Sequence, residues 1–369
     1  MAEMMKAAFL YTDRPRHMGI EDVPKPGCGV GDVLIKVNAC AICGTDGRMY
    51  EGTKDVTKGF TPQIGGCGEG KFIIGHEITG IVEEIGPRVE NPDYKIGSKV
   101  ILVTSIGCEK QGCKACQIGN YNMCKNNQPI GYYYPGGFAE YILVPEKAVR
   151  QDVIIPVPEN SLVSDEHLSM VEPLSCVING QNYLGIKEGE YVTIVGAGPI
   201  GLMHGLLAKS RGGKVILAEY SEGRLNKAKE FGFDHYISTK DADLVETVLE
   251  ITRGQGTDVG VVACSVNKVA EDFLQAMAMM GRLSFFAGFP KQDSILKLDG
   301  NIIHYKEVSI YGSFASSRPH FEEALKMIAG GKISMDRIVT HTFSLEKIVE
   351  AMEKILDKEG NALKVVIIR

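Results

Sequence analysis

The sequence predicts an α/β protein that combines a twisted β domain with a doubly wound domain built on a parallel sheet. Its 369 residues exceed what one compact core usually holds, so two domains are expected. Short β-rich segments separated by Gly and Pro run from Met5 to about Ile155, which is typical of a β domain. From Tyr191 the pattern changes to alternating strands and helices, which indicates a doubly wound parallel sheet.

The β domain is predicted from four segments that are rich in β-branched and aromatic residues and bounded by turn residues. They read VLIKVNA, ITGIVEEIG, KVILVTSI and FAEYILVP. The doubly wound domain is predicted from the strands VTIVG, VILAE, VGVVAC and RLSFFAG. Its helices are expected to end near Ser210 and to run from about Arg224 to Phe231.

The C-terminal part is expected to return to the first domain. After about Ile303 the pattern predicts a strand (VSIYGS), helices over about 319–329 and 345–356, and a final strand (KVVIIR). The doubly wound domain would then be an insertion. The predicted domains are residues 1–165, 166–305 and, for the C-terminal return, 306–369.

The composition indicates an ordinary globular chain, with 44% apolar residues, 23% charged residues and a formal net charge of -6. This mildly acidic balance gives no reason to expect nucleic acid or an anionic membrane as a partner, because both require clustered Lys and Arg. No segment approaches the roughly 20 apolar residues that span a bilayer, and no secretory signal is visible. A cytoplasmic location is therefore expected.

A dinucleotide site is predicted where GxGxxG directly follows a strand and opens a helix. The three glycines would provide a tight turn, close approach of the pyrophosphate and close packing of helix on strand. Glu219 ends the next strand, where a carboxylate can accept both ribose hydroxyls and repel a 2′-phosphate, so NAD is favoured over NADP. Arg224 slightly weakens that preference. The candidate cofactor-binding residues are Gly196, Gly198, Pro199, Ile200, Gly201, Glu219 and Arg224.

Four of the ten cysteines crowd into 17 residues, too unevenly for a disulfide scaffold in a long chain. Four thiolates at this spacing suit a tetrahedral structural zinc ion. A zinc ribbon that binds nucleic acid is a weaker alternative, because the region is not strongly basic. The candidate ligands are Cys108, Cys113, Cys116 and Cys124.

A second metal site is predicted from two motifs, CGTD at Cys43–Asp46 and GHE at Gly75–Glu77. They supply a thiolate, an imidazole and a carboxylate, a mixture that suits a catalytic zinc ion with an open position. Either motif alone is common. Their occurrence together, upstream of a dinucleotide fold, favours a zinc-dependent enzyme.

The order CGTD, GHE, cysteine lobe, GGFAEY, EPL and VGAGPIG resembles the zinc-containing medium-chain dehydrogenase family, and within it the sorbitol, threonine and other polyol dehydrogenases. The resemblance covers nearly the whole chain. It implies that the first domain is GroES-like, that the inserted domain is a Rossmann domain and that the active site lies in the cleft. It also implies a homodimer or homotetramer that acts on a small polar molecule.

The resemblance implies roles for individual residues. Cys43 and His76 would be ligands of the catalytic zinc ion, and Thr45 would hand on the proton of the alcohol. Three residues compete to complete the metal shell, and we rank the first two above the third: Glu77, Glu172 and Cys176.

Departures from the family pattern bear on the substrate. Arg48 stands where many relatives carry a relay His, and a guanidinium cannot shuttle protons. His76 follows Cys43 by 33 positions, and the Gly-rich stretch TPQIGGCGEG between them is expected to reshape the pocket mouth. In the cysteine lobe Lys110 stands where the usual spacing wants Cys, so Cys108 is expected to replace it.

These features predict a zinc-dependent oxidoreductase that transfers a hydride between NAD(H) and a secondary alcohol. The acid of EPL favours a polyol, a cyclic polyol, a sugar acid or a sugar phosphate. Sorbitol ranks lower because Ala315 follows Phe314 where sorbitol dehydrogenases place Arg, the basic residue coming only at Arg318. Arg48 disfavours threonine and offers a cation for an anionic group. Alternatives are threonine 3-dehydrogenase-like oxidation, a zinc-free quinone reductase and a non-enzymatic NAD-binding protein.

Overall fold

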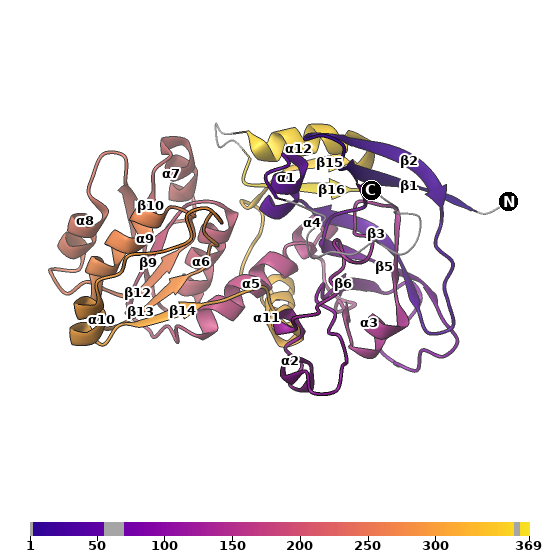
Figure 1. Cartoon of the computed structure of the whole chain (residues 1–369), viewed down its shortest axis with the longest axis horizontal. Helices are drawn as coiled ribbons and strands as arrows, with labels where there is room; N and C mark the ends of the chain where they lie inside the picture. Colours follow the sequence, from indigo (N-terminus) through magenta and orange to yellow (C-terminus); the bar gives the residue numbers. More distant parts are fainter. Residues whose placement is uncertain (1–2, 55–69, 358–361) are drawn as a thin grey trace. The chain divides into compact units, whose positions relative to one another are not determined.

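The computed structural model describes residues 3–54, 70–357 and 362–369, and the chain divides into two units (Figure 1). The first unit comprises the described residues up to 175 and those from 316 onward, and the second comprises residues 176–315. The second unit is therefore inserted in the chain of the first. The boundaries expected after residues 165 and 305 each lie ten residues before those of the structure, 175 and 315.

The first unit contains two β-sheets. A three-stranded sheet has the order β2-β1-β4, and a seven-stranded sheet has the order β15-β16-β3-β5-β6-β8, with β7 also paired to β3. Its described strands are β1 (Met4–Tyr11), β2 (Met18–Pro24), β3 (Val33–Ala41), β4 (Lys71–Phe72), β5 (Glu77–Ile85), β6 (Lys99–Leu102), β7 (Tyr141–Val144), β8 (Ile154–Pro156), β15 (Val339–Ser344) and β16 (Lys364–Ile368).

The C-terminal strand β16 lies inside this sheet, between β15 and β3. Val366 pairs with Ala41 and Ile368 with Ala39, and apolar side chains along β16 are buried. Helix α12 packs against both β15 and β16. The described helices of this unit are α1 (Gly44–Tyr50), α2 (Lys114–Gln117), α3 (Glu146–Arg150), α4 (Asp165–Leu168), α11 (Arg318–Ala329) and α12 (Ile348–Leu356), with α5 (Val171–Asn182) leading into the second unit.

The second unit is built on six parallel strands in the order β11-β10-β9-β12-β13-β14, which is the doubly wound arrangement. Helix α6 packs on β9 and β10, and α7 packs on β10 and β11 (Figure 1). The elements are β9 (Tyr191–Val195), α6 (Pro199–Ser210), β10 (Lys214–Glu219), α7 (Glu222–Lys229), β11 (His235–Ser238), α8 (Leu244–Ile251), β12 (Thr257–Val262), α9 (Asn267–Phe273), β13 (Met277–Phe285), α10 (Gly300–Lys306) and β14 (Ser309–Gly312).

The strand β14 corrects the expectation that VSIYGS belongs to the C-terminal return. It pairs in parallel with β13 and is the sixth strand of the doubly wound sheet. A parallel neighbour requires a crossover, and the short helix α10 supplies it. The sequence analysis did not predict this helix, so it gave no reason to place VSIYGS beside β13.

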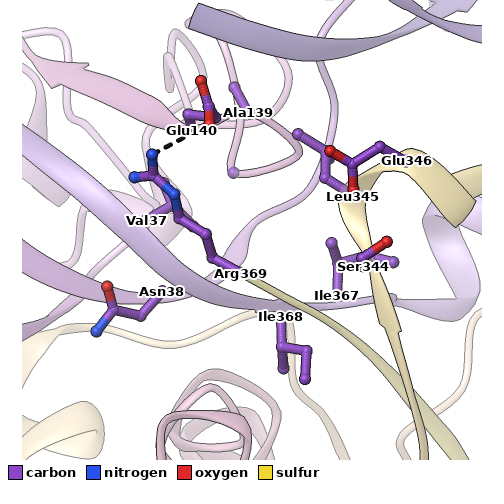
Figure 2. Close-up of a pocket in the computed structure, with 11 residues that line it drawn as sticks. Val37, Asn38, Ala139, Glu140, Ser344, Leu345, Glu346, Ile367, Ile368 and Arg369 are labelled. Atoms are coloured by element: carbon purple, nitrogen blue, oxygen red, sulfur yellow. Dashed lines mark hydrogen bonds and ion pairs between the residues drawn. The ribbon is translucent and has the colours of Figure 1, made fainter.

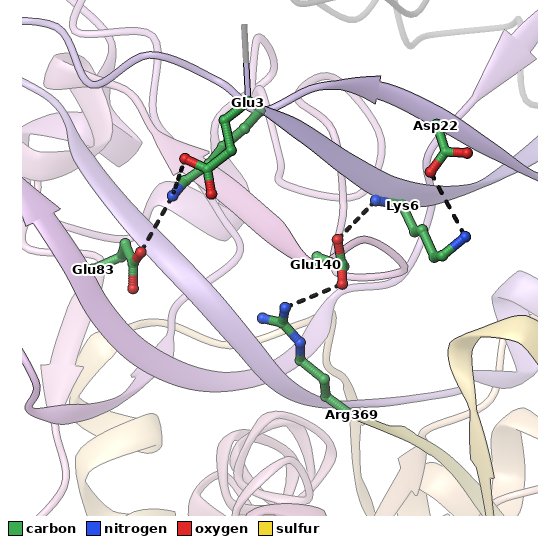
Figure 3. Close-up of polar contacts among 7 residues, drawn as sticks. Glu3, Lys6, Asp22, Glu83, Glu140 and Arg369 are labelled. Carbon is green, nitrogen blue, oxygen red and sulfur yellow. Dashed lines mark hydrogen bonds and ion pairs between the residues drawn. The ribbon is translucent and has the colours of Figure 1, made fainter.

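Hydrogen bonds to Glu140 connect three segments of the first unit. Its carboxylate accepts a hydrogen bond from the backbone N–H of Lys6 at 2.8 Å and from Nη2 of Arg369 at 3.1 Å (Figure 3). These contacts join β1, the segment before β7 and the residue after β16. Because both charged side chains are partly exposed, their ion pair contributes at most about 1 kcal/mol.

Among the described helices, none has both the length and the apolar character needed to cross a membrane.

Candidate functional site

The residues Cys43, His76 and Glu77 come together in the first unit. One potential ligand atom from each lies within 4.8 Å of the others. Cys43 follows β3 and immediately precedes α1, whereas His76 and Glu77 stand at the start of β5. Because Ala41 on β3 pairs with Glu77 on β5, the strand register brings the two motifs to the same end of the sheet.

Asp46 orients this cluster, a role that we did not predict. The side chain is fully buried, and Oδ2 accepts a hydrogen bond from the backbone N–H of Cys43 at 2.9 Å. Oδ1 lies 3.4 Å from Nδ1 of His76, which leaves Nε2 of that ring for a metal ion. Burial by itself lowers the pKa of His76, but Asp46 and Cys43 outweigh it and raise this pKa well above its usual value.

Glu77 forms a buried ion pair with Lys364, which the sequence analysis also missed. Nζ of Lys364 lies 2.6 Å from Oε1 of Glu77, and the two residues are 5% and 1% exposed. Burial raises the pKa of Glu77, Lys364 lowers it and the charge of Glu172 raises it again, to about 7. The charge of Lys364 thus compensates a carboxylate that would otherwise be buried alone.

The cluster fits a zinc ion by its donor set. Thiolate, imidazole and carboxylate are the ligands that zinc takes in catalytic sites, where three protein ligands leave one position open. Nδ1 of His76 and Oε2 of Glu77 are not free for an ion, because Asp46 and Lys364 lie beside them at 3.4 Å and 2.5 Å. Nε2 of His76, the thiol of Cys43 and a carboxylate oxygen of Glu77 are the atoms that would hold the ion.

The other residues named in the sequence analysis stand on several elements, and none of them belongs to this cluster of ligand atoms. Glu172 stands on α5, near enough for its charge to raise the pKa of Glu77, but it is outside the cluster of ligand atoms. Cys176 belongs to the second unit. Thr45 stands on α1, and its hydroxyl accepts a hydrogen bond from Nη2 of Arg48 at 3.0 Å. Arg318 instead donates to the backbone oxygens of Asp152 and Ile154.

Tyr132 is a further residue beside the cluster that we did not single out. Its ring lies 5.1 Å from the ring of His76, centroid to centroid. Burial raises the pKa of Tyr132 well above its usual value, and Asp46 and Cys43 add to this rise. The only sequence signal was an aromatic run, GYYY, shortly before GGFAEY.

The predicted cysteine lobe also assembles. The sulfur atoms of its four cysteines lie within 4.8 Å of one another, with Cys108 and Cys116 3.9 Å apart and Cys113 and Cys124 3.8 Å apart. A tetrahedron with Zn–S bonds of about 2.3 Å has sulfur atoms about 3.8 Å apart. The spacing therefore fits zinc.

The turn that brings Cys108 into this lobe explains its unusual spacing. Glu109 has φ 54° and Gly112 has φ 84°, so the chain reverses between Cys108 and Cys113. The backbone N–H of Lys110 donates to the sulfur of Cys108, which lowers the pKa of this thiol to about 6. Cys108 thus occupies the fourth corner, where the family spacing wanted a cysteine at Lys110.

In the second unit, the local geometry explains why glycine stands at each of the three positions of GxGxxG. Gly196 has φ 112°, a conformation that favours glycine, at the turn out of β9. A Cβ on Gly198 would meet nothing within 4 Å, so the backbone is open to a ligand there. A Cβ on Gly201 would lie 1.8 Å from the backbone oxygen of Gly196. These are the three roles that a dinucleotide motif requires.

Glu219 ends β10 beside this turn. Its Oε2 accepts a hydrogen bond from the N–H of Ala197 at 2.7 Å, and its Oε1 accepts from the N–H groups of Tyr220 and Ser221, both at 2.8 Å. The carboxylate is thereby fixed next to the glycine turn. Oε2 retains a lone pair for a ribose hydroxyl, whereas Oε1 already accepts two hydrogen bonds.

A cavity of about 150 Å³ lies elsewhere in the first unit, between the end of β16 and the segment before β7 (Figure 2). Its lining includes Val37, Glu140, Leu345 and Arg369 but no residue of either metal cluster. The stretch TPQIGGCGEG, expected to reshape the pocket mouth, falls outside the described residues except for Gly70.

Comparison with known proteins gives two family models and many relatives. Residues 29–158 match the alcohol dehydrogenase GroES-like domain, and residues 199–330 match the zinc-binding dehydrogenase model. The chain is 37% identical to L-threonine 3-dehydrogenase of Pyrococcus furiosus, over 94% of this chain and 92% of the relative. It is 32% identical to sorbitol dehydrogenase of Halalkalibacterium halodurans, over 98% and 99%.

Solved structures agree with this similarity along the whole chain. A zinc-binding dehydrogenase from Sinorhizobium meliloti, bound to NADP, superposes with a TM-score of 0.85 at 28% identity and covers 100% of both chains. An alcohol dehydrogenase from Escherichia coli CFT073, in complex with NADH, gives a TM-score of 0.85 at 26% identity, also over 100% of both chains. These matches confirm the predicted GroES-like and Rossmann-type folds.

Proposed function

Because the chain belongs to the zinc-containing medium-chain dehydrogenase family, we propose that it is an NAD-dependent dehydrogenase that oxidises a secondary alcohol of a small polyhydroxylated molecule. The observation that carries this proposal is the cluster of Cys43, His76 and Glu77 within 4.8 Å, in a chain that also contains a complete dinucleotide turn. A thiolate, an imidazole and a carboxylate would hold the zinc ion at the active site.

The proposal assigns distinct tasks to the residues around this cluster. Cys43, His76 and Glu77 would bind the zinc ion, which supplies Lewis acidity to the substrate hydroxyl when bound. Asp46 holds the His76 ring in place, and Lys364 balances the charge of Glu77. Glu172 would add a polar partner for a substrate hydroxyl. The four cysteines of the lobe would hold a second, structural zinc ion.

Thr45 would receive the proton of the substrate hydroxyl over one hydrogen bond. Its hydroxyl oxygen already accepts a hydrogen bond from Arg48. A guanidinium has no acceptor atom and stays charged at ordinary pH, so the proton leaves Thr45 toward another group. The proton path of this enzyme therefore differs from that of relatives with a relay His.

The cofactor is proposed to be NAD. The fixed carboxylate of Glu219 would accept a hydrogen bond from a ribose hydroxyl through Oε2 and repel a 2′-phosphate. Discrimination is expected on the order of tenfold to hundredfold in kcat/KM. We expect Glu219→Ala to narrow that ratio, whereas Glu222→Ala, which removes a neighbouring acid at the start of α7, should leave it unchanged. Equal use of both cofactors by the unaltered enzyme would refute this assignment.

The test of the main proposal is a screen for nicotinamide reduction across polyols, inositols, sugar acids, sugar phosphates and threonine, combined with elemental analysis. We expect two zinc ions per chain and turnover of a hydroxyl-rich substrate, with ethanol poor. Absence of zinc from the purified protein, or turnover that survives chelation of all metal, would contradict the mechanism.

A second candidate is oxidation of an amino alcohol such as L-threonine. The similarity to L-threonine 3-dehydrogenase of Pyrococcus furiosus supports this candidate. Arg48 at the relay position argues for ranking it lower, and threonine as the best substrate in the screen would reverse that ranking. We also propose a homodimer or homotetramer, as the family resemblance implies. A reducing compartment such as the cytoplasm suits a chain with two thiolate metal sites.

A further inference from the structure

Arg48 directs its guanidinium back over the motif that carries Cys43. Nη2 donates to Thr45 at 3.0 Å, and Nη1 lies 3.9 Å from the position that a Cβ on Gly44 would take. Side chains on a helix lean toward its N-terminal end, which here carries the charge toward the metal cluster. The cation is therefore held beside the site at which the substrate hydroxyl would bind.

The charge of Arg48 is accessible and has no anionic partner among the residues that the structure describes. Arg48 is exposed, and its one side-chain hydrogen bond to residues 3–54, 70–357 and 362–369 goes to the neutral hydroxyl of Thr45. A guanidinium carries five N–H donors in a planar fork. Most of these donors remain available to a ligand.

Lys54 places a second cation near the same cluster. Its backbone N–H donates to the backbone oxygen of Arg48 at 3.0 Å, which ties the two residues together just after α1. Its Nζ lies 5.6 Å from the centroid of the Tyr132 ring, within cation–π distance. Because Tyr132 packs on His76, a single aromatic ring separates Lys54 from the metal cluster.

Two acidic groups of the site, Asp46 and Glu77, are less accessible than these cations. Asp46 and Glu77 are 0% and 1% exposed, and Glu77 is already paired with Lys364. Arg48 is exposed and Lys54 is partly exposed. A ligand that approaches from solvent therefore meets positive charge before it meets the buried carboxylates.

We propose that Arg48 and Lys54 form an anion-recognition pair that makes the enzyme selective for hydroxylated substrates bearing a carboxylate or a phosphate. This inference rests on the proposed dehydrogenase function and narrows its substrate class. The fork of Arg48 matches either anion with two parallel hydrogen bonds, and Lys54 adds a point charge. A neutral polyol would offer no negative charge to the guanidinium of Arg48.

The test measures binding and kinetics of the zinc-loaded enzyme with NAD. Calorimetry would compare three probes, namely D-gluconate, sorbitol 6-phosphate and neutral sorbitol. We expect the better anion to bind at least about tenfold more tightly than sorbitol, because hydrogen bonds to charged groups are the stronger class. Whether gluconate or sorbitol 6-phosphate binds better identifies the anion as carboxylate or phosphate.

Arg48→Gln and Lys54→Gln should each weaken binding of the better anion by roughly tenfold and change binding of sorbitol less than twofold. For the best anionic substrate of the screen, KM should rise more than kcat falls. The matched controls Arg88→Gln and Lys95→Gln remove cations whose side chains are 64% and 67% exposed and should change neither constant.

Three results would overturn the inference: anions that bind no more tightly than sorbitol, equal losses for anion and sorbitol in the variants, or variants that weaken only NAD binding. Each can occur in an enzyme that contains zinc and turns over a polyol, so it leaves the proposed function standing. Failure of the proposed function instead means that no substrate of any charge is turned over.

Discussion

Two buried histidines, one in each unit, show how surroundings decide what a buried polar group does. His76 faces the carboxylate of Asp46 and the thiol of Cys43, and its pKa is raised well above the usual value. His204, in helix α6, meets the neutral amide of Gln181 and the edge of the Phe286 ring. Burial lowers the pKa of His204 to about 3, and the charge of Arg211 contributes.

The difference teaches that burial alone does not mark a functional residue. Both side chains are nearly inaccessible, at 6% and 0% exposed. Only His76 is surrounded by negative groups whose charge a cation would balance. His204 remains neutral, and its ring contacts the Gln181 amide between α5 and α6, so we interpret it as structural.

The largest expected effect separates the two histidines by activity. His76→Ala should lower kcat/KM at least 1000-fold, because it would remove a ligand of the zinc ion that we propose activates the substrate. His204→Asn should retain turnover, since asparagine can still accept the hydrogen bond from Gln181. The measurement is steady-state kinetics with zinc content and circular dichroism for each variant. Comparable activity losses in both variants would show that His76 is no more important for activity than His204.

The next effect concerns the charge that compensates Glu77. Lys364→Met leaves this carboxylate buried without its partner, which should lower the free energy of unfolding by about 3–5 kcal/mol. The double variant Lys364→Met with Glu77→Gln should recover part of the loss. Urea unfolding of chelator-treated protein measures both. An unchanged midpoint in the single variant would show that the pair does not stabilise the fold.

A smaller effect is the pH dependence that His204 gives to the free energy of unfolding. The folded pKa of His204, about 3, lies below its ordinary 6.5, so below pH 6.5 the unfolded chain binds a proton that the folded chain does not. Its contribution to stability is present above pH 6.5 and is lost as pH falls. Between pH 6.5 and 4.5 the protein should lose about 2 kcal/mol more than His204→Asn. If the free energies of unfolding of the unaltered protein and His204→Asn changed equally with pH, His204 would not be buried in its neutral form.

The smallest expected effect concerns the group that orients His76. Asp46→Asn keeps the size of the side chain but removes the charge beside Nδ1, so zinc affinity at this site should fall about 10- to 100-fold. Competition with a chromophoric chelator measures that affinity. The cysteine lobe serves as the internal control, because its affinity should not change. A loss at both sites would indicate general unfolding.

Local spacing predicted the glycine turn and the cysteine lobe, whereas the site of Cys43, His76 and Glu77 was predicted from two separate motifs taken together. The glycine turn needs only neighbours within six residues, and the four cysteines lie within 17. Lys364 could not be found in this way, because it stands 287 positions from Glu77 and reaches it only through the sheet. A lysine in the apolar run KVVII was the sole indication of burial.

Similar reasons explain where the fold prediction was incomplete. The segment VSIYGS was correctly identified as a strand, but alternation does not say which sheet a strand joins. The strand β15, VTHTFS, was not anticipated, because four of its six residues are polar and leave few apolar side chains. Asp46 lay inside a motif that we quoted, yet its contact with His76 depends on the β3–β5 register.

The position of β16 between β15 and β3 has a consequence for biosynthesis. A ribosome delivers the chain from its N-terminus, so all six strands of the parallel sheet emerge before residues 364–368. The inserted unit can fold while the seven-stranded sheet still lacks the strand that joins β15 to β3. Until then Glu77 has no Lys364, and the thiol of Cys43 is held in an incomplete sheet. The first unit can therefore complete its seven-stranded sheet only after the whole inserted unit has been synthesised.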